Sequence, residues 1–321
     1  MNKIAPVLVI GAGSIGERHI GNLIKLGFTN IVVYRQRNLP FRFVNPEKVK
    51  VETDWEAVKK YLFQFAIICT PTDQHLQQTI DCIALDIHVL VEKPLSHTTV
   101  GIERLKAAVQ VHNKIVHVAY MMQFHPQLTR VEQIISEGTY GKLMAISTNW
   151  GSYLPDWHPY EDYKTSYASQ KIMGGGAALT LSHDIEVANR LSGGTLVSSS
   201  KHFGYTSALQ IDTESVADFH LNYSNGVIAH VHLNYLEQIP RRNYTFLFEN
   251  GTILIDYFAG TMQTINKLVN ETHHLKNFDR NDMFISELEY FIKLTASTDC
   301  VTHSLDQINK SAVIIKLCNN D

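Results

Sequence analysis

The chain has 321 residues, of which 45% are hydrophobic and 18% charged, and its net charge is −3. This composition is typical of a globular protein with two domains and not of a disordered chain. No run of lysine and arginine is long enough to follow a phosphate backbone, and the apolar stretches are short and interrupted. We therefore expect neither a nucleic-acid partner nor a membrane-spanning segment. The four scattered cysteines form no C-x-x-C pair, which favours a reducing, cytoplasmic compartment.

The first third of the chain alternates predicted strands and helices. Val7–Ile10 is a continuous apolar run that ends in glycines, as a buried parallel strand does, and a helical pattern follows it as far as Gly27. The later strands are predicted at Ile31–Tyr34, Phe65–Cys69, Val89–Val91 and Ile115–Ala119. This alternation predicts an α/β domain with a doubly wound parallel sheet over residues 1–120.

The pattern changes after about Tyr120. A helix (about Gln127 to Glu137), a strand at Leu143–Asn149, a long irregular segment and a helix over Ala177–Leu191 are followed by strands of alternating polarity. Asn225-Gly226 and Asn250-Gly251 are strong hairpin signals between these strands. The strands in question are predicted at Glu214–Tyr223, Val227–Tyr235, Tyr244–Glu249 and Thr252–Tyr257, and two further helices at about Asp282–Thr295 and Ser304–Leu317. We expect an α+β domain over residues 121–321 with a mostly antiparallel, open-faced sheet.

A glycine-rich turn directly follows the first predicted strand. It has the pattern G-x-G-x-x-G and opens a helix, which is the context that gives this motif its meaning. The glycines allow a tight turn, a close approach of the backbone to a pyrophosphate, and close packing of helix on strand. The helix N-terminus offers N–H groups to the phosphates. The predicted cofactor-binding residues of this turn are Gly11, Gly13, Ser14, Ile15 and Gly16.

The end of the second strand is where NAD and NADP are distinguished in this kind of domain. The residues from Val33 to Arg37 include no aspartate or glutamate to accept hydrogen bonds from a ribose 2′-hydroxyl. Arg35 and Arg37 can instead pair with a 2′-phosphate. The sequence therefore favours NADP(H) over NAD(H).

Two further polar motifs lie at predicted strand ends, where open α/β sheets bind ligands. One contains Thr70 and Pro71, with His75 shortly after, and the other is Glu92-Lys93-Pro94. A lysine at this edge is suited to stabilise a developing alkoxide on a substrate that is being oxidised. The peptide bond before Pro94 can be cis or trans, and the sequence does not distinguish the two.

These motifs together resemble the Gfo/Idh/MocA family, the relatives of glucose–fructose oxidoreductase and inositol dehydrogenase. The resemblance rests on the glycine-rich turn, the T-P-x-x-x-H loop, the E-K-P motif and the mostly antiparallel second half. Gly174–Gly176, followed by Leu181–Glu186, is similar to the glycine-rich lead into the family's catalytic helix. The segment from Tyr153 to Tyr163 resembles the members associated with bacterial surface-sugar pathways.

The resemblance implies hydride transfer between a sugar or polyol carbinol and a nicotinamide, with Lys93 and His183 as catalytic residues. Histidine suits proton transfer because its ordinary pKa lies near neutrality. One departure affects this assignment. The family commonly has an aspartate one turn before the histidine, whereas this chain has Thr180, which cannot act as a base. Three alternatives remain open: Lys93 and His183 suffice for catalysis, Asp184 or Glu186 takes part in it, or the activity is altered or lost.

Candidate substrate contacts come from two stretches of the second half. Tyr120, Gln123 and His125 follow the last strand of the first domain as neutral groups that can contact a sugar, and Thr180 and His183 complete that set. The irregular segment is rich in aromatic side chains suited to stacking on sugar faces. The candidate residues of this stretch are Trp150, Tyr153, Trp157, His158, Tyr160 and Tyr163. A loop that only packs over a domain junction explains them equally well.

No histidine or cysteine spacing in the chain is typical of a metal site, and we expect none. His230 and His232 alternate on one predicted strand, alongside His220 on a neighbouring strand. A metal site at these residues is less favoured than a solvated or subunit-contacting sheet face. In the family that the chain resembles, this face often forms subunit contacts, which implies a homodimer or homotetramer.

The sequence thus favours a cytoplasmic NAD(P)-dependent oxidoreductase acting on a sugar or nucleotide sugar. Two other functions stay open. One is a glycosidase of the same fold that keeps NAD bound and oxidises its substrate transiently. The other is a non-catalytic regulator that binds a dinucleotide, an alternative that Thr180 keeps open.

Overall fold

A computed structural model describes residues 2–36 and 39–319. The chain forms two compact units. The first unit consists of the chain up to Ala119 together with Asn281–Lys316, and the second of Tyr120–Arg280 together with the chain from Leu317. No helix of the described residues is long and apolar enough to cross a membrane.

The first unit contains a six-stranded, wholly parallel sheet in the order β3-β2-β1-β4-β5-β6. The chain order reverses between β1 and β4, and this is the point at which such sheets bind ligands. The strands are β1 (Val7–Ile10), β2 (Ile31–Tyr34), β3 (Lys50–Glu52), β4 (Phe65–Ile68), β5 (His88–Glu92) and β6 (Val116–Ala119). The edge strand β3 was not predicted, because three residues of which two are charged have no strand signature.

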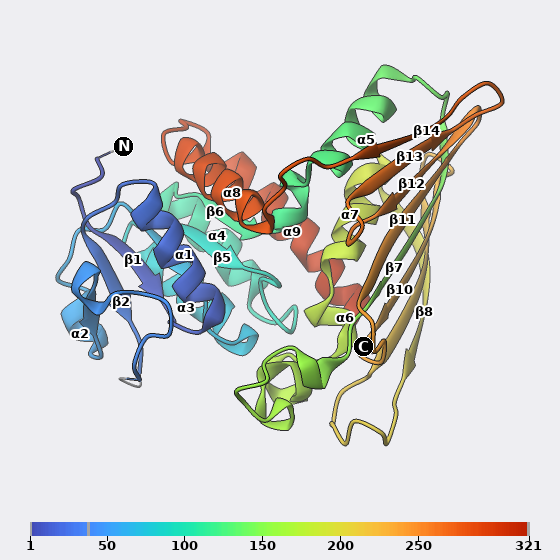
Figure 1. Cartoon of the computed structure of the whole chain (residues 1–321). Coiled ribbons are helices and arrows are strands. Elements are labelled where there is room, and N and C mark those ends of the chain that lie inside the picture. Colours follow the sequence, from blue (N-terminus) through green and yellow to red (C-terminus); the bar gives the residue numbers. More distant parts are fainter. Residues whose placement is uncertain (1, 37–38, 320–321) are drawn as a thin grey trace. The chain divides into compact units, whose positions relative to one another are not determined.

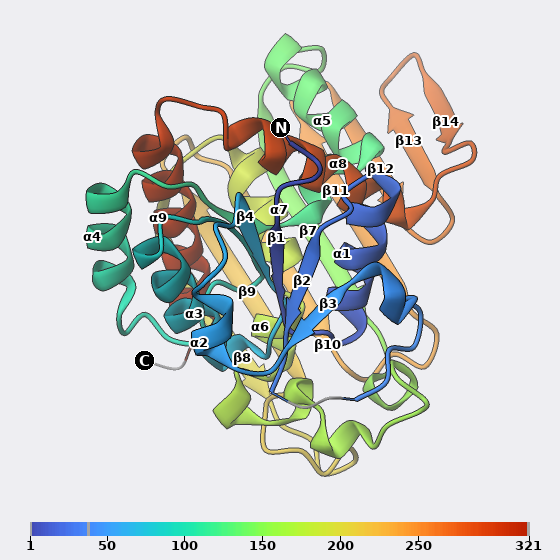
Figure 2. The ribbon, with the colours of Figure 1, turned by 90° about the vertical axis from the view of Figure 1, so that its left-hand side faces the viewer.

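Helices cover both faces of this sheet, as the doubly wound prediction requires. Helix α1 lies on one side of strands β1 to β3, and α3 and α4 lie on the other (Figure 2). The α1 side chains Ile20 and Leu23 are fully buried in one core with Val7 and Val9 of β1. The helices that follow the strands are α1 (Ser14–Lys25), α2 (Trp55–Val58), α3 (Thr72–Ala84) and α4 (Ile102–His112).

The two C-terminal helices, α8 (Arg280–Leu294) and α9 (Cys300–Cys318), belong almost entirely to the first unit. Leu288 and Phe291 of α8 are fully buried in the same core as β1. The hydroxyl of Ser304 in α9 accepts a hydrogen bond from the Val116 amide at 2.8 Å and so joins α9 to β6. The expected assignment of residues 121–321 to one domain is therefore incomplete, since the chain returns to complete the first core.

The second unit contains an eight-stranded sheet in the order β14-β13-β12-β11-β7-β10-β9-β8. Every neighbouring pair is antiparallel except β7 and β10, which are parallel. The strands are β7 (Leu143–Gly151), β8 (Leu196–Gly204), β9 (Val216–Tyr223), β10 (Ile228–Asn234), β11 (Arg241–Phe248), β12 (Gly251–Asp256), β13 (Thr261–Ile265) and β14 (Asn270–His274). The expected fold class, a Rossmann domain with a mostly antiparallel α+β domain, is confirmed.

Helices α5 (Pro126–Glu137) and α7 (His183–Ser192) lie on one side of this large sheet (Figure 1). The helix predicted over Ala177–Leu191 is instead two helices, because the short α6 (Ala177–Thr180) ends before α7 begins. Short 3₁₀ turns occupy the irregular segment between Leu154 and Met173.

Polar side chains alternate along the other side of the large sheet. His230 pairs with His220 in the register of β10 and β9, with ring centroids 4.8 Å apart, and the carboxylate of Asp218 lies 2.8 Å from Nδ1 of His232. Among the described residues, no group of three or more histidine, cysteine or acidic side chains has a geometry that could hold a metal ion. These histidines thus form part of a polar sheet face.

Candidate functional site: a dinucleotide turn and a buried histidine cluster

The glycine-rich turn joins β1 to α1. Gly11 has a φ of +91°, a conformation that disfavours any side chain, and a Cβ there would lie 2.8 Å from the carbonyl oxygen of Cys69. A Cβ at Gly16 would collide with the carbonyl oxygen of Gly11, whereas Gly13 faces open space. Since Gly13 precedes the first residue of α1, no side chain stands there over the first-turn N–H groups. This cradle fits the pyrophosphate of a dinucleotide.

His75 connects two loops at the carboxyl ends of β4 and β5. Its Nδ1 lies 2.8 Å from the carbonyl oxygen of Pro94, and its Nε2 lies 2.7 Å from that of Thr70. The ring is 2% exposed, and this burial lowers the pKa of His75. Both ring nitrogens of His75, which was predicted to contact the cofactor, thus face backbone carbonyl groups.

Glu92 and Lys93 leave the end of β5 beside a second buried histidine. The carboxylate of Glu92 lies 2.9 Å from Nε2 of His19 on α1, and it also accepts the backbone N–H of Lys93 at 3.3 Å. The Lys93–Pro94 peptide bond is cis, and Lys93 is half-buried. The backbone on either side of Lys93 is thus fixed, by His19 through Glu92 and by His75 through Pro94.

Arg35 lies just beyond β2, and its guanidinium stacks 4.2 Å from the centroid of the Phe41 ring. Arg37, the other arginine expected to contact a 2′-phosphate, lies outside the described residues. Thr70 donates its hydroxyl to Gln78 at 2.6 Å, and Pro71 immediately precedes α3.

In the second unit, His183 begins α7 and is 5% exposed. Two aromatic rings lie close to it. The ring of Tyr120 meets it edge-on at 5.8 Å, and that of Trp150 lies at 6.2 Å. Burial raises the pKa of Tyr120, so its hydroxyl stays protonated at neutral pH. Tyr120, a predicted substrate contact, thus lies beside His183.

Asp184, one of the predicted catalytic residues, is paired with a residue that sequence reasoning missed. Its Oδ2 lies 2.5 Å from a guanidinium nitrogen of Arg242, and the Arg242 guanidinium lies over the ring of Trp150 at 4.1 Å. Burial opposes the charge of Arg242, but Asp184, together with Tyr244 and Tyr257, outweighs burial and raises the pKa of Arg242. The sequence contains one signal for this pair: Arg242 lies in the alternating series of β11 positions whose other members are buried aromatic residues.

Gln123 and Glu186 form a second polar pair in this unit. The amide of Gln123 donates to Oε1 of Glu186 at 3.0 Å, and the same oxygen lies 3.1 Å from Nε of Arg190. Burial raises the pKa of Glu186, although Arg190 and Gln123 act in the opposite direction. The side-chain amide of Gln123, predicted to contact substrate, is therefore bonded to Glu186.

Thr180 occupies the position of the family's aspartate and is 4% exposed at the end of α6. Tyr235, a fully buried residue at the end of β10, donates its hydroxyl to the Ala168 carbonyl at 3.3 Å and also interacts with Thr180. A neutral hydroxyl thus stands where the family usually has a carboxylate.

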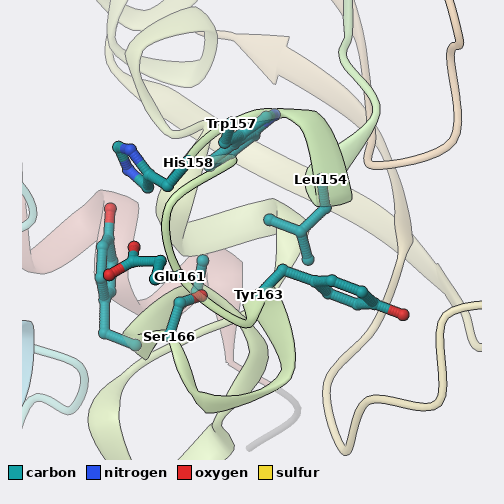
Figure 3. Close-up of a pocket in the computed structure, with 8 residues that line it drawn as sticks. Leu154, Trp157, His158, Glu161, Tyr163 and Ser166 are labelled. Atoms are coloured by element: carbon teal, nitrogen blue, oxygen red, sulfur yellow. The ribbon is translucent and has the colours of Figure 1, made fainter.

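Some of the predicted sugar-stacking residues make contacts with other residues of the protein. The Trp157 indole donates to the hydroxyl of Ser152 at 3.0 Å and packs edge-on against Tyr235, and the Tyr163 hydroxyl donates to the Leu209 carbonyl at 3.0 Å. Figure 3 shows the Tyr163 ring pointing away from His158 and Glu161. Tyr153 is half-exposed beside this segment. The small pocket here is lined by Leu154, Trp157, His158, Glu161, Tyr163, Ser166, Tyr167 and Ala168.

Comparison with known protein families identifies both halves of the chain. Residues 6–120 match a family described as an oxidoreductase family with an NAD-binding Rossmann fold, and residues 128–254 match the GFO/IDH/MocA C-terminal domain. The chain belongs to the Gfo/Idh/MocA family. It is therefore a member of an NAD-binding oxidoreductase family.

Two dehydrogenases are similar to this chain over part of their length. A 1-carboxy-3-chloro-3,4-dihydroxycyclohexa-1,5-diene dehydrogenase of Comamonas testosteroni is 29% identical over 165 residues, which are 51% of this chain and 40% of that protein. A levoglucosan dehydrogenase of Pseudarthrobacter phenanthrenivorans is 29% identical over 128 residues, 39% of this chain and 32% of that protein. The matched region thus spans less than half of these Gfo/Idh/MocA relatives.

Solved structures share the fold over nearly the whole chain. Levoglucosan dehydrogenase in complex with NADH superimposes with a TM-score of 0.77 and 18% identity, covering 97% of both chains. An aldose-aldose oxidoreductase from Caulobacter crescentus gives a TM-score of 0.81 and 15% identity, covering 98% of this chain and 96% of that chain. At these identities the similarity shows the common Gfo/Idh/MocA fold.

Proposed function

We propose that this protein is an NAD(P)-dependent dehydrogenase or reductase that acts on the carbinol or ketone of a sugar or sugar derivative. The observation that carries the proposal is the setting of Lys93. Its backbone is fixed through Glu92 by His19 and through Pro94 by His75, and both histidines are buried. A lysine held in this way suits a fixed electrostatic role, because a preorganised charge needs no rearrangement during the reaction.

The nicotinamide, when bound, accepts or supplies the hydride with its electron pair at the carbinol carbon. The glycine cradle around Gly11 and Gly16 holds the pyrophosphate. The Lys93 ammonium stabilises the negative charge that develops on the substrate oxygen, and His183 accepts the hydroxyl proton during oxidation and returns it during reduction. Asp184 positions His183 through its ion pair with Arg242 rather than exchanging a proton itself, since its carboxylate is buried and paired.

We propose NADP(H) as the preferred cofactor. Arg35 follows β2, lies over the Phe41 ring, and can pair with a 2′-phosphate. No acidic side chain from Val33 to Gln36 offers an acceptor to a ribose 2′-hydroxyl.

We propose a neutral sugar or a nucleotide sugar as the substrate class. Support comes from similar proteins, which include a levoglucosan dehydrogenase and an inositol 2-dehydrogenase. Within this chain, Tyr120 and Trp150 offer rings beside His183, and ring faces of this kind suit the C–H faces of sugars. A cytoplasmic homodimer or homotetramer, with subunits meeting on the polar face of the large sheet, completes the proposal.

A non-catalytic dinucleotide-binding regulator is the second candidate, and Thr180 is the observation that favours it. A threonine carries no charge at the position of the family's carboxylate, and this one is buried against Tyr235. Such a protein binds cofactor normally and turns over no substrate.

Two measurements on the purified protein test these proposals. Fluorescence titration with NADPH and NADH gives both dissociation constants, and we expect tighter binding of NADPH. NADH binding that is equally tight or tighter would contradict the preference. An absorbance screen of sugars and nucleotide sugars in both redox directions tests turnover. Tight cofactor binding without oxidation or reduction of any of them would favour the regulator.

A further inference from the structure

Glu17 is an acidic residue in the first turn of α1 that the proposed reaction does not use. It directly follows the last glycine of the turn and is only 4% exposed. A buried carboxylate is costly unless its oxygens accept hydrogen bonds, so its partners indicate what it does.

The partners of Glu17 are three successive backbone N–H groups of the loop that follows β2. Arg42 donates to Oε1 and Oε2 at 3.0 Å each, Phe43 to Oε2 at 2.6 Å, and Val44 to Oε2 at 3.2 Å. Consecutive N–H groups that converge in this way form an anion-binding concavity, and here the anion is a side chain of the protein itself. Charge-assisted bonds of this kind are about twice as strong as neutral ones.

These hydrogen bonds, which we call the Glu17 clamp, hold the loop that carries the ring over which Arg35 lies. Phe41 directly precedes the clamped amides and packs against the core of the first unit, and Val44 is buried in that core. The Arg35 guanidinium lies 4.2 Å from the centroid of the Phe41 ring. The loop therefore holds the ring over which the guanidinium lies.

We infer that Glu17 is a positioning residue for cofactor selection: by holding the backbone of Arg42–Val44, it keeps Phe41 beneath Arg35 and so orients that guanidinium toward a ribose 2′-phosphate. This inference rests on the proposed preference for NADP(H). It does not concern the pyrophosphate, which both cofactors carry. Loss of the clamp should therefore weaken NADPH binding specifically, because a bidentate contact with a phosphate depends on the orientation of the guanidinium.

The test measures dissociation constants for NADPH and NADH in the full chain by fluorescence titration. Arg35→Ala should raise the NADPH constant about tenfold or more. Glu17→Ala should raise it about three- to tenfold, and the NADH constant should stay within about twofold. Glu103→Ala is the matched control, because it removes a carboxylate from an exposed helix position and should change neither constant. Glu17→Gln keeps one acceptor oxygen and replaces Glu17→Ala if that variant does not fold.

A double variant separates positioning from a general effect on the domain. If Glu17 acts through Arg35, then Glu17→Ala should have no further effect on NADPH binding in the Arg35→Ala background. Phe41→Leu, which leaves the Glu17 clamp intact, should lower the preference for NADPH in the same way. Equal weakening for both cofactors in Glu17→Ala, or an unchanged ratio in Glu17→Ala and Glu17→Gln, would overturn the inference. A wild-type protein that does not prefer NADPH overturns the proposed cofactor, and this inference with it, before any variant is compared.

Discussion

Asp184 and Arg242 form an ion pair in which both side chains are almost fully buried. Their closest nitrogen and oxygen atoms are 2.5 Å apart, and the side chains are 0% and 3% exposed. Asp184 directly follows His183 at the start of α7, and Arg242 lies on β11. The pair thus connects the first turn of the proposed catalytic helix to the centre of the large sheet.

Arg242→Met should destabilise the protein by about 3–5 kcal/mol, because it leaves the Asp184 carboxylate buried without its counter-charge. Urea denaturation followed by circular dichroism measures the change. Arg130→Met is the matched control, since Arg130 is about half-exposed and lies 3.6 Å from Glu137. Its effect should stay within about 0.5 kcal/mol. Similar, small changes in both variants would show that the buried pair does not stabilise the fold.

Lys93→Ala should abolish most turnover while the affinity for cofactor stays nearly unchanged. The ammonium acts on the substrate oxygen, so we expect kcat to fall by about 10²–10⁴-fold. Stopped-flow or steady-state absorbance measures kcat on the substrate that the screen identifies, and fluorescence titration measures the dissociation constant of the cofactor. Lys59→Ala, at an exposed position just after α2, should leave both unchanged. A Lys93→Ala variant that keeps most of its activity would rule out the role assigned to this residue.

His183→Asn should also lower kcat by about 10²–10⁴-fold, since asparagine cannot take up the hydroxyl proton. If Lys93 and His183 act on the same substrate oxygen, their effects are not independent. The Lys93→Ala/His183→Asn double variant should then lose little more activity than the poorer single variant. Losses in kcat that multiply would instead indicate two independent contributions.

The pH dependence of stability should include a contribution from His125. Its ring is fully buried between Tyr257 and Phe278, and neither of its nitrogens has a hydrogen-bond partner among the described residues. Burial, and after it the charge of Arg242, lowers the pKa of His125 to about 4. In the unfolded chain this pKa is about 6.5. The unfolded state therefore binds more protons between these values, and the free energy of unfolding falls as the pH is lowered from about 6.5 to 4.

His125→Phe removes this titration and keeps an aromatic ring in the same place. The loss of stability between about pH 6.5 and 4 should shrink by up to about 3 kcal/mol. Urea denaturation at a series of pH values measures it. His273→Phe is the control, because the His273 side chain is 56% exposed. A His125→Phe variant with the same pH dependence as the wild type would show that His125 is not buried in its neutral form.

The hydrophobic patterns along the chain were sufficient to predict much of the fold. β1 and β2 have the predicted bounds, and most other predicted strands differ from the observed ones by one to three residues. Short or polar strands were missed, namely β3, β8, β13 and β14. Lys50–Glu52 and Asn270–His274 bury too little apolar surface to show a strand pattern, and they form strands because a neighbouring strand offers its hydrogen-bonding edge.

The sequence by itself determined the elements that depend on local chemistry. Gly11 and Gly16 specify the turn between β1 and α1, because a Cβ at either position would collide with the backbone. Lys93 was predicted as a catalytic residue from its place after a buried strand and from the E-K-P motif. Only the tertiary structure decided what depends on distant contacts. It paired Asp184 with Arg242 across 58 positions and returned α8 and α9 to the first core. It also turned His75 toward two backbone carbonyls. The hydrophobic periodicity of the sequence indicates which side of a helix or strand is buried. Which residues pack against that side depends on how the whole chain folds.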